Sequence, residues 1–297
     1  MKRRYIFGVI VFIGVLLAAG CAPPIYVPFK VENTPQTLDT RVYVSISQDE
    51  INAFVEPSNL SVGAGGGLLV ALIDAGVNSY RTSRANRLIE PVRKEVSDID
   101  FRAVFLASLE KTLRALPTIQ MTKIDSTAKA VSDKDRDNLR KELPETGLLS
   151  ISTKYELGAD FQSFYITTVV SLWLRDAKEA TYLARYHYYT PPILPSEDRE
   201  AAAKAWAVDH GAPVRAAVQE GIAETMKMMQ LDFRPAPQFL PPPDSMPKFA
   251  AGAILTKASP SDVTFLATDG KRFIVRYRDI LWSASIDERF TATGVRQ

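Results

Sequence analysis

The stretch GLLSISTKYELGADFQSFYITTVVSLWLRDAKEATYLARYHYYT, residues 147–190, decides the fold. Apolar and polar side chains alternate along most of it, and a period of two residues is typical of strands with one buried face. The alternation predicts three consecutive strands, at about 147–157, 161–174 and 179–190. Because only short connections separate these strands, we expect them to be neighbours in one mixed or antiparallel sheet.

Helical patterns on both sides of this stretch predict the layer that covers the sheet. Residues 98–116 carry an apolar stripe and end before Pro117, as an amphipathic helix does. Two more helices are expected, at about 199–209 and after Gly211 and Pro213. The other expected elements are strands at about 41–47 and 118–124, helices at about 68–89 and 132–143, and a short helix after residues 47–50. This order predicts an α+β domain over residues 41–232, with a mixed or antiparallel sheet covered by helices.

The C-terminal part of the chain has a different composition. Six prolines between Pro235 and Pro247 predict an extended linker over residues 233–250. Beyond it, Asp269-Gly270 separates two alternating runs, which is a strong hairpin signal. We therefore expect residues 251–297 to form a small β unit of their own.

The N-terminal residues have the layout of an export signal. Lys2, Arg3 and Arg4 precede an apolar run over residues 5–17, and small residues then lead to Cys21, the only cysteine. A cysteine directly after Ala-Gly resembles a bacterial lipoprotein signal, which implies cleavage before Cys21 and acylation of that residue. On this interpretation residues 1–20 are a signal peptide and residues 21–40 a lipidated tether. The alternative is an uncleaved anchor, but the apolar run is shorter than the ~20 residues that a spanning helix needs.

The resemblance also implies a location and constrains the partners. In Gram-negative lipoproteins an Asp after the cysteine favours inner-membrane retention, and here the residue is Ala22, which implies the periplasmic face of the outer membrane. Several acyl chains attach a protein stably to a membrane.

Without residues 1–20 the chain has 33 basic and 34 acidic residues, a formal charge of −1. Because nucleic-acid-binding proteins show a clustered basic footprint, we expect no nucleic-acid partner.

The sequence contains no pattern typical of catalysis or metal binding. His187 and His210 stand apart, and neither has a zinc-ligand spacing to another histidine or to cysteine. No Gly-x-Ser-x-Gly motif is present. Residues 133–137 imitate the start of a calcium loop, but Asn138 and Pro144 stand where that loop needs Gly and Glu. We therefore predict no catalytic residue, no metal ligand and no cofactor.

A glycine-rich segment followed by an apolar helix is the candidate interface. The helix is apolar nearly all round its first turns, so it must be buried in its own domain, against a second chain or in a membrane. Asp74 argues against deep membrane insertion. The candidate interface residues are Gly65, Gly66, Gly67, Leu68, Leu69, Leu72 and Ile73. The alternative is a loop that leads into a buried helix.

Two further patterns have a structural and a functional interpretation. Arg81, Arg84, Arg87 and Arg93 give the same helix a basic side, which suits either water or an acidic partner and lipid headgroups. Alternation places the tyrosines at 182, 186 and 188 on one face of a strand, where they pack under helices or stack on a ligand.

The element order over residues 42–231, together with the lipoprotein signal, resembles the α/β domain of periplasmic lipoproteins used in envelope assembly and secretion. Examples are the curli-secretion lipoprotein and the TolB N-terminal domain, and the chain is also similar to uncharacterised Gram-negative lipoproteins. The resemblance implies a non-enzymatic outer-membrane lipoprotein that faces the periplasm and binds a protein partner or self-associates. The alternatives are an accessory subunit of a transport or secretion system, and an envelope hydrolase or transferase with an unrecognised site.

Overall fold

A mixed β-sheet organises the chain. The computed structural model describes residues 27–29, 38–55, 68–194, 198–233, 263–268, 272–277 and 280–285. Its strands are β1 (Leu38–Ser45), β2 (Asn52–Ala53), β3 (Ile119–Thr127), β4 (Gly147–Leu157), β5 (Phe164–Leu174), β6 (Tyr182–Tyr189), β7 (Val263–Thr268), β8 (Arg272–Tyr277) and β9 (Ile280–Ser285). The strand order is β3-β1-β4-β5-β6-β9-β8-β7, and β2 pairs with the end of β4. Parallel pairs (β3-β1-β4 and β6-β9) alternate with antiparallel ones, so the sheet is mixed.

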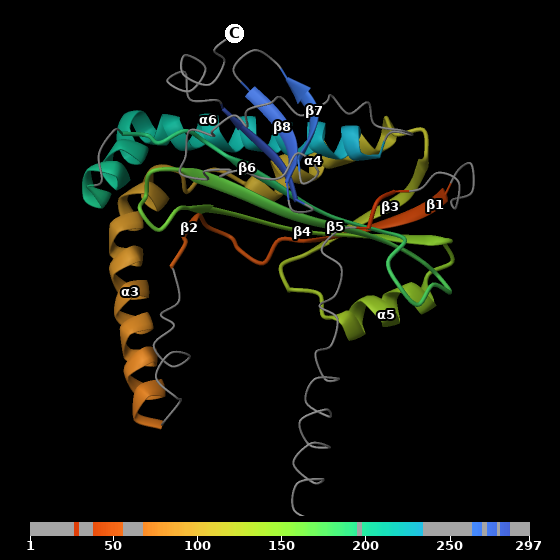
Figure 1. The fold of residues 1–297 in the computed structure, drawn as a ribbon, viewed down its shortest axis with the longest axis horizontal. Helices are drawn as coiled ribbons and strands as arrows, with labels where there is room; N and C mark the ends of the chain where they lie inside the picture. The colour runs from red at the N-terminus through yellow and green to blue at the C-terminus, as the bar shows by residue number, and fades with distance from the viewer. Residues whose placement is uncertain are drawn as a thin grey trace, which may run out of the picture.

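Helices lie on both faces of this sheet. They are α3 (Leu68–Glu95), α4 (Phe101–Arg114), α5 (Asp133–Glu142) and α6 (Arg199–Asp232). Figure 1 shows α4 and α6 along one face, with α5 on the other and α3 running away from the sheet. The predicted α+β class, with a mixed sheet covered by helices, is confirmed.

The core lies between the sheet and the pair α4 and α6. Alternate side chains of the strands, such as Val44, Ile151 and Ile166, are fully buried there. The apolar stripes of the helices meet them, and each stripe has the spacing predicted from the sequence. The buried members of these stripes include Phe105, Leu109 and Leu113 of α4 and Val214, Val218, Ile222, Met226 and Met229 of α6.

The break predicted at Gly211 and Pro213 is present. Residues 208–211 leave helical geometry, and Asp209, His210 and Gly211 have positive φ values of 50°, 57° and 70°. Left-handed backbone favours glycine, and a Cβ at Gly211 would also collide with the Val96 side chain. The chain therefore forms two helical pieces with different directions within α6.

Two predictions about local structure were wrong. Residues after Ser47 do not form a short helix, because Asn52–Ala53 pairs in parallel with the end of β4. The Gln48 amide nitrogen donates to the Tyr155 carbonyl at 2.6 Å, so a tertiary contact decides the conformation of this segment. Helix α3 also continues through Pro91 to Glu95 instead of ending near residue 89. Ile89 and Val92 are fully buried, and this packing supports the helix across the proline.

The N-terminal segment is attached to the sheet. Val27 and Leu183 exchange two backbone hydrogen bonds, with N–O distances of 2.8 and 3.0 Å. The Phe29 ring lies 5.1 Å from the Phe233 ring and 6.0 Å from the Tyr182 ring, measured between centroids. The chain is thus fixed to the domain inside the stretch predicted as a tether. Cys21 and the predicted signal peptide lie outside the described residues.

The C-terminal strands have the predicted hairpin. β7 and β8 pair antiparallel, β9 follows antiparallel to β8, and β9 also pairs in parallel with β6. The predicted 251–297 unit therefore continues the main sheet through the β6–β9 pair. The predicted linker, apart from the buried Phe233, lies outside the described residues.

The candidate interface falls at the start of α3. Gly65, Gly66 and Gly67 lie outside the described residues. Leu68, Leu69, Leu72 and Ile73 are in the first turns of the helix, as predicted, but the surroundings of their side chains are not described, so the interface stays a prediction. Within the described part of the chain, no helix is long and apolar enough to cross a membrane.

Candidate functional site

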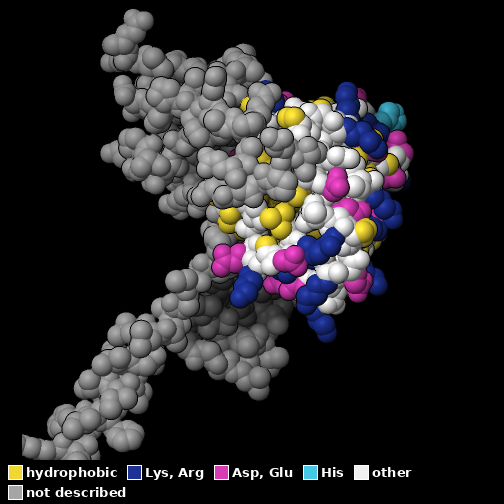
Figure 2. All heavy atoms as spheres, turned by 90° about the vertical axis from the view of Figure 1, so that its right-hand side faces the viewer, with side chains coloured by type: hydrophobic (Ala, Val, Ile, Leu, Met, Phe, Trp, Pro, Cys, Tyr) yellow, Lys and Arg dark blue, Asp and Glu magenta, His cyan; other side chains and the backbone are white. Residues whose placement is uncertain are grey.

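The charged groups at the β1–β3 end of the sheet pair locally. Figure 2 shows this end of the molecule, where basic and acidic side chains intermingle. Asp125 accepts from Arg41 Nε at 2.6 Å and lies 2.8 Å from Lys123 Nζ. Because Asp125 is partly buried and paired with both cations, these charges balance one another, and they define no site among the described residues at this end.

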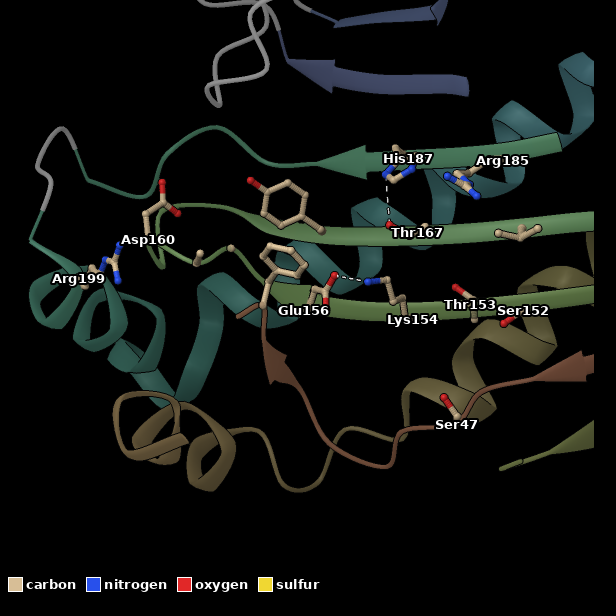
Figure 3. Close-up of a pocket in the computed structure, with 15 residues that line it drawn as sticks. Ser47, Ser152, Thr153, Lys154, Glu156, Asp160, Thr167, Arg185, His187 and Arg199 are labelled. Atoms are coloured by element: carbon tan, nitrogen blue, oxygen red, sulfur yellow. Dashed lines mark hydrogen bonds and ion pairs between the residues drawn. The ribbon is translucent and has the colours of Figure 1, made fainter. Parts of the chain in front are cut away.

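The open face of β4, β5 and β6, opposite α4 and α6, holds a hollow of about 770 Å³ (Figure 3). The strand register sets its floor in rows: Ser152, Val169 and Arg185 in one, and Lys154, Thr167 and His187 in the next. Gly158, Asp160 and the start of α6 close one end, and Ser47 and Phe54 form part of the wall. We call this space the open-face hollow.

Helix α5 covers the neighbouring part of the same face. Its Arg136 guanidinium stacks over the Trp173 ring at 3.9 Å from the centroid, and Arg140 lies over the same ring. Ser132 caps the helix through a capping box with Asp135. Because α5 is short and packs at one end of the strands, it leaves the middle rows uncovered.

The open-face hollow carries unpaired positive charge. Lys154 Nζ is 2.6 Å from Glu156 Oε1, so these two charges balance. Arg185 and Arg199 make no hydrogen bond or ion pair with the described part of the chain, and Asp160 is the acid that remains. Cationic side chains therefore exceed acidic ones in the hollow, which favours a ligand with an anionic group.

Neutral hydrogen-bonding groups complete the lining. His187 Nδ1 lies 3.2 Å from Thr167 Oγ1. Burial lowers the pKa of His187 to about 4, and the nearby charges of Arg185 and Lys154 act in the same direction. Burial also raises the pKa of Tyr165 to about 12. At neutral pH both side chains are uncharged, and each offers polar atoms for a ligand to contact.

The buried histidine makes stability depend on pH. Between the ordinary pKa of 6.5 and the folded-state pKa of about 4, the unfolded chain binds a proton that the folded chain does not. The free energy of unfolding should therefore have its full value well above pH 6.5 and decrease by about 3 kcal/mol as the pH falls to 4. Urea unfolding at several pH values measures this slope.

The two histidines provide a matched pair of variants for this test. His187→Gln should remove that part of the pH dependence, whereas His210→Gln should leave it, because His210 is 94% exposed. An unchanged pH dependence in His187→Gln would show that another group is responsible.

The aromatic residues on the other face of β6 belong to the core. Tyr182, Tyr186 and Tyr188 are fully buried, which confirms the packing interpretation. The Tyr182 hydroxyl donates to Asp232 Oδ2 at 2.6 Å, and the Tyr188 hydroxyl donates to Glu220 at 2.7 Å. Burial, reinforced by Asp232, raises the pKa of Tyr182 well above its ordinary value.

The sequence did not single out most residues of the open-face hollow. In the sequence Lys154, Thr167 and Arg185 are only the polar members of alternating strands, and His187 is predicted to be neither a catalytic residue nor a metal ligand. Cys21 and Gly65–Gly67 lie outside the described residues, so the structure does not place them relative to the hollow. Among the described residues, no group of three or more His, Cys, Asp or Glu side chains is arranged to hold a metal ion.

Comparisons with known proteins identify no family. No family model matches the chain, and no curated protein matches it. Among solved structures, the hypothetical protein CT253 from Chlamydia trachomatis is similar at 9% identity and a TM-score of 0.21. That match covers 63% of this chain and 96% of the other. A likeness this weak carries no argument about fold or function.

Proposed function

We propose that the chain is an outer-membrane lipoprotein, anchored at Cys21 and facing the periplasm. In this proposal it binds a protein partner and catalyses no reaction. The observation that supports the binding role is the open-face hollow, where Arg185 and Arg199, which pair with no described residue, lie beside neutral His187 and the apolar Phe54. Fixed charge next to apolar and hydrogen-bonding groups is the usual composition of a recognition site.

The docked N-terminus supports the anchoring role. Six residue steps separate Cys21 from Val27, and a fully extended chain of that length spans about 20 Å. Val27 is hydrogen-bonded to β6, so an acyl group on Cys21 would hold the domain directly beside the membrane. The anchor would then limit which partners reach the hollow.

The Thr167–His187 contact is the observation that favours the alternative of an envelope hydrolase. A histidine that activates a hydroxyl works best with a pKa near the operating pH. With a pKa of about 4, His187 has little tendency to take a proton from Thr167. The pair therefore supports hydrogen bonding to a ligand better than catalysis.

Site-specific crosslinking in intact envelopes tests the binding role. Ser152 is exposed and lines the hollow, so Ser152→Cys carries a thiol-reactive photocrosslinker into it. We expect a discrete crosslinked product that disappears when Arg185→Glu is added, because that change reverses the charge that attracts the partner.

Ala216→Cys, at an exposed position of α6 outside the hollow, is the matched control. It should give no discrete product. Equal products from both positions, or a Ser152→Cys product that survives Arg185→Glu in a folded protein, would contradict a partner at the open face.

A further inference from the structure

A second hollow, of about 590 Å³, lies between α3 and the start of α6. Tyr80, Arg84, Arg87 and Leu88 line it from α3, and their spacing puts them on one helix face. Residues 198–200 line it from α6. We call it the α3–α6 hollow.

Three guanidinium groups share this space without a partner among the described residues. Within the described part of the chain, Arg84, Arg87 and Arg199 make no hydrogen bond or ion pair. Other arginines nearby are used structurally: Arg93 donates to the Ile51 carbonyl at 2.9 Å, and Arg215 pairs with Asp98. Of the four arginines on the basic side predicted from the sequence, Arg93 has a structural role, and Arg84 and Arg87 line the hollow.

The acids of the hollow are already engaged. Asp198 accepts from the backbone N–H groups of Glu200 and Ala201, at 2.9 and 3.2 Å, and so caps α6. The Glu200 carboxylate lies 2.9 Å from Lys204 Nζ. Three guanidinium groups therefore share the hollow with one other carboxylate, that of Asp198, so positive charge is in excess. A bound anion would reduce the repulsion among the guanidinium groups.

From this arrangement we infer that the α3–α6 hollow binds a phosphate-bearing group. A guanidinium presents a planar fork of donors that matches two oxygens of a phosphate, and arginines from two helices hold such a group from both sides. The Tyr80 side chain, 63% exposed, stands at the same hollow. The same chemistry would recognise a lipid headgroup or a soluble phosphate compound.

Titration calorimetry on the full chain in neutral detergent tests the inference. The probes are inorganic pyrophosphate and the short-chain lipid dihexanoyl phosphatidic acid. We expect saturable binding of at least one probe, weakened at least tenfold by Arg84→Gln with Arg87→Gln, and also by Arg199→Gln. If the lipid bound ten times more tightly than pyrophosphate, the ligand would be a lipid headgroup. If pyrophosphate bound ten times more tightly than the lipid, the ligand would be a soluble phosphate compound.

Arg114→Gln is the matched control, because Arg114 is an exposed arginine on α4 that pairs with Glu110. It should bind both probes as the parent does. If neither probe bound, or if Arg114→Gln weakened binding as much as the other variants do, the inference would be overturned. Arg199 lines both hollows, whereas Arg84 and Arg87 line only this one, so the Arg84→Gln with Arg87→Gln result is independent of the crosslinking at Ser152.

Discussion

Gly221→Leu is expected to abolish folding. Gly221 lies where α6 packs against the sheet. A Cβ at this position would lie 2.6 Å from Tyr188 Cδ1 and 2.7 Å from Ile166 Cδ1. Both neighbours are fully buried, and the Tyr188 hydroxyl is held by Glu220. Overpacking by single methylenes already costs about 1–3 kcal/mol, and a domain of this kind has only about 5–15 kcal/mol of stability.

Circular dichroism and urea unfolding measure this effect. Ala223→Leu adds a large side chain at an exposed position of the same helix. It should change the free energy of unfolding by no more than about 0.5 kcal/mol. If Gly221→Leu unfolded at the urea concentration of the parent, the packing of α6 against β5 and β6 described above would be incorrect.

Cys21→Ser is expected to remove the protein from the outer membrane. Without the Cys21 thiol there is no sulfur to carry the diacylglycerol. The variant should therefore be released from its acyl anchor, or stay with the inner membrane through an uncleaved signal over residues 1–20. Separation of the two membranes by density, followed by immunoblotting, measures the distribution.

Ala22→Ser is the control for this variant, because it alters the neighbouring residue and leaves Cys21 in place. It should remain in the outer-membrane fraction. An outer-membrane fraction of Cys21→Ser equal to that of the parent would mean that something other than the acyl group holds the protein there.

The period-two and helical patterns predicted most of the fold. The strand expected at 147–157 has those bounds in β4, and the two runs on either side of Asp269-Gly270 form the antiparallel pair β7 and β8. Gly211 and Pro213 marked the break within α6, because left-handed backbone and a missing N–H are properties of the residues themselves. Local chemistry decides these features, so the sequence is sufficient to predict them.

Features that depend on distant contacts could not be predicted in this way. The Val27–Leu183 pair joins residues 156 apart, and Asp232 meets Tyr182 across 50 residues. The open-face hollow depends on the register that aligns Lys154, Thr167 and His187. In the sequence alone, such polar residues are indistinguishable from those of any solvent-facing strand.

Mass spectrometry of the N-terminus, on protein purified from envelopes, tests whether the protein is anchored through Cys21. We predict that the chain begins at Cys21 and that this residue carries a diacylglycerol on its sulfur and an acyl group on its amine. Tandem fragmentation would place both modifications on Cys21, six residues before Val27, which is hydrogen-bonded to β6. An unmodified Cys21, or a chain that still begins at Met1, would show that the proposed anchor is wrong.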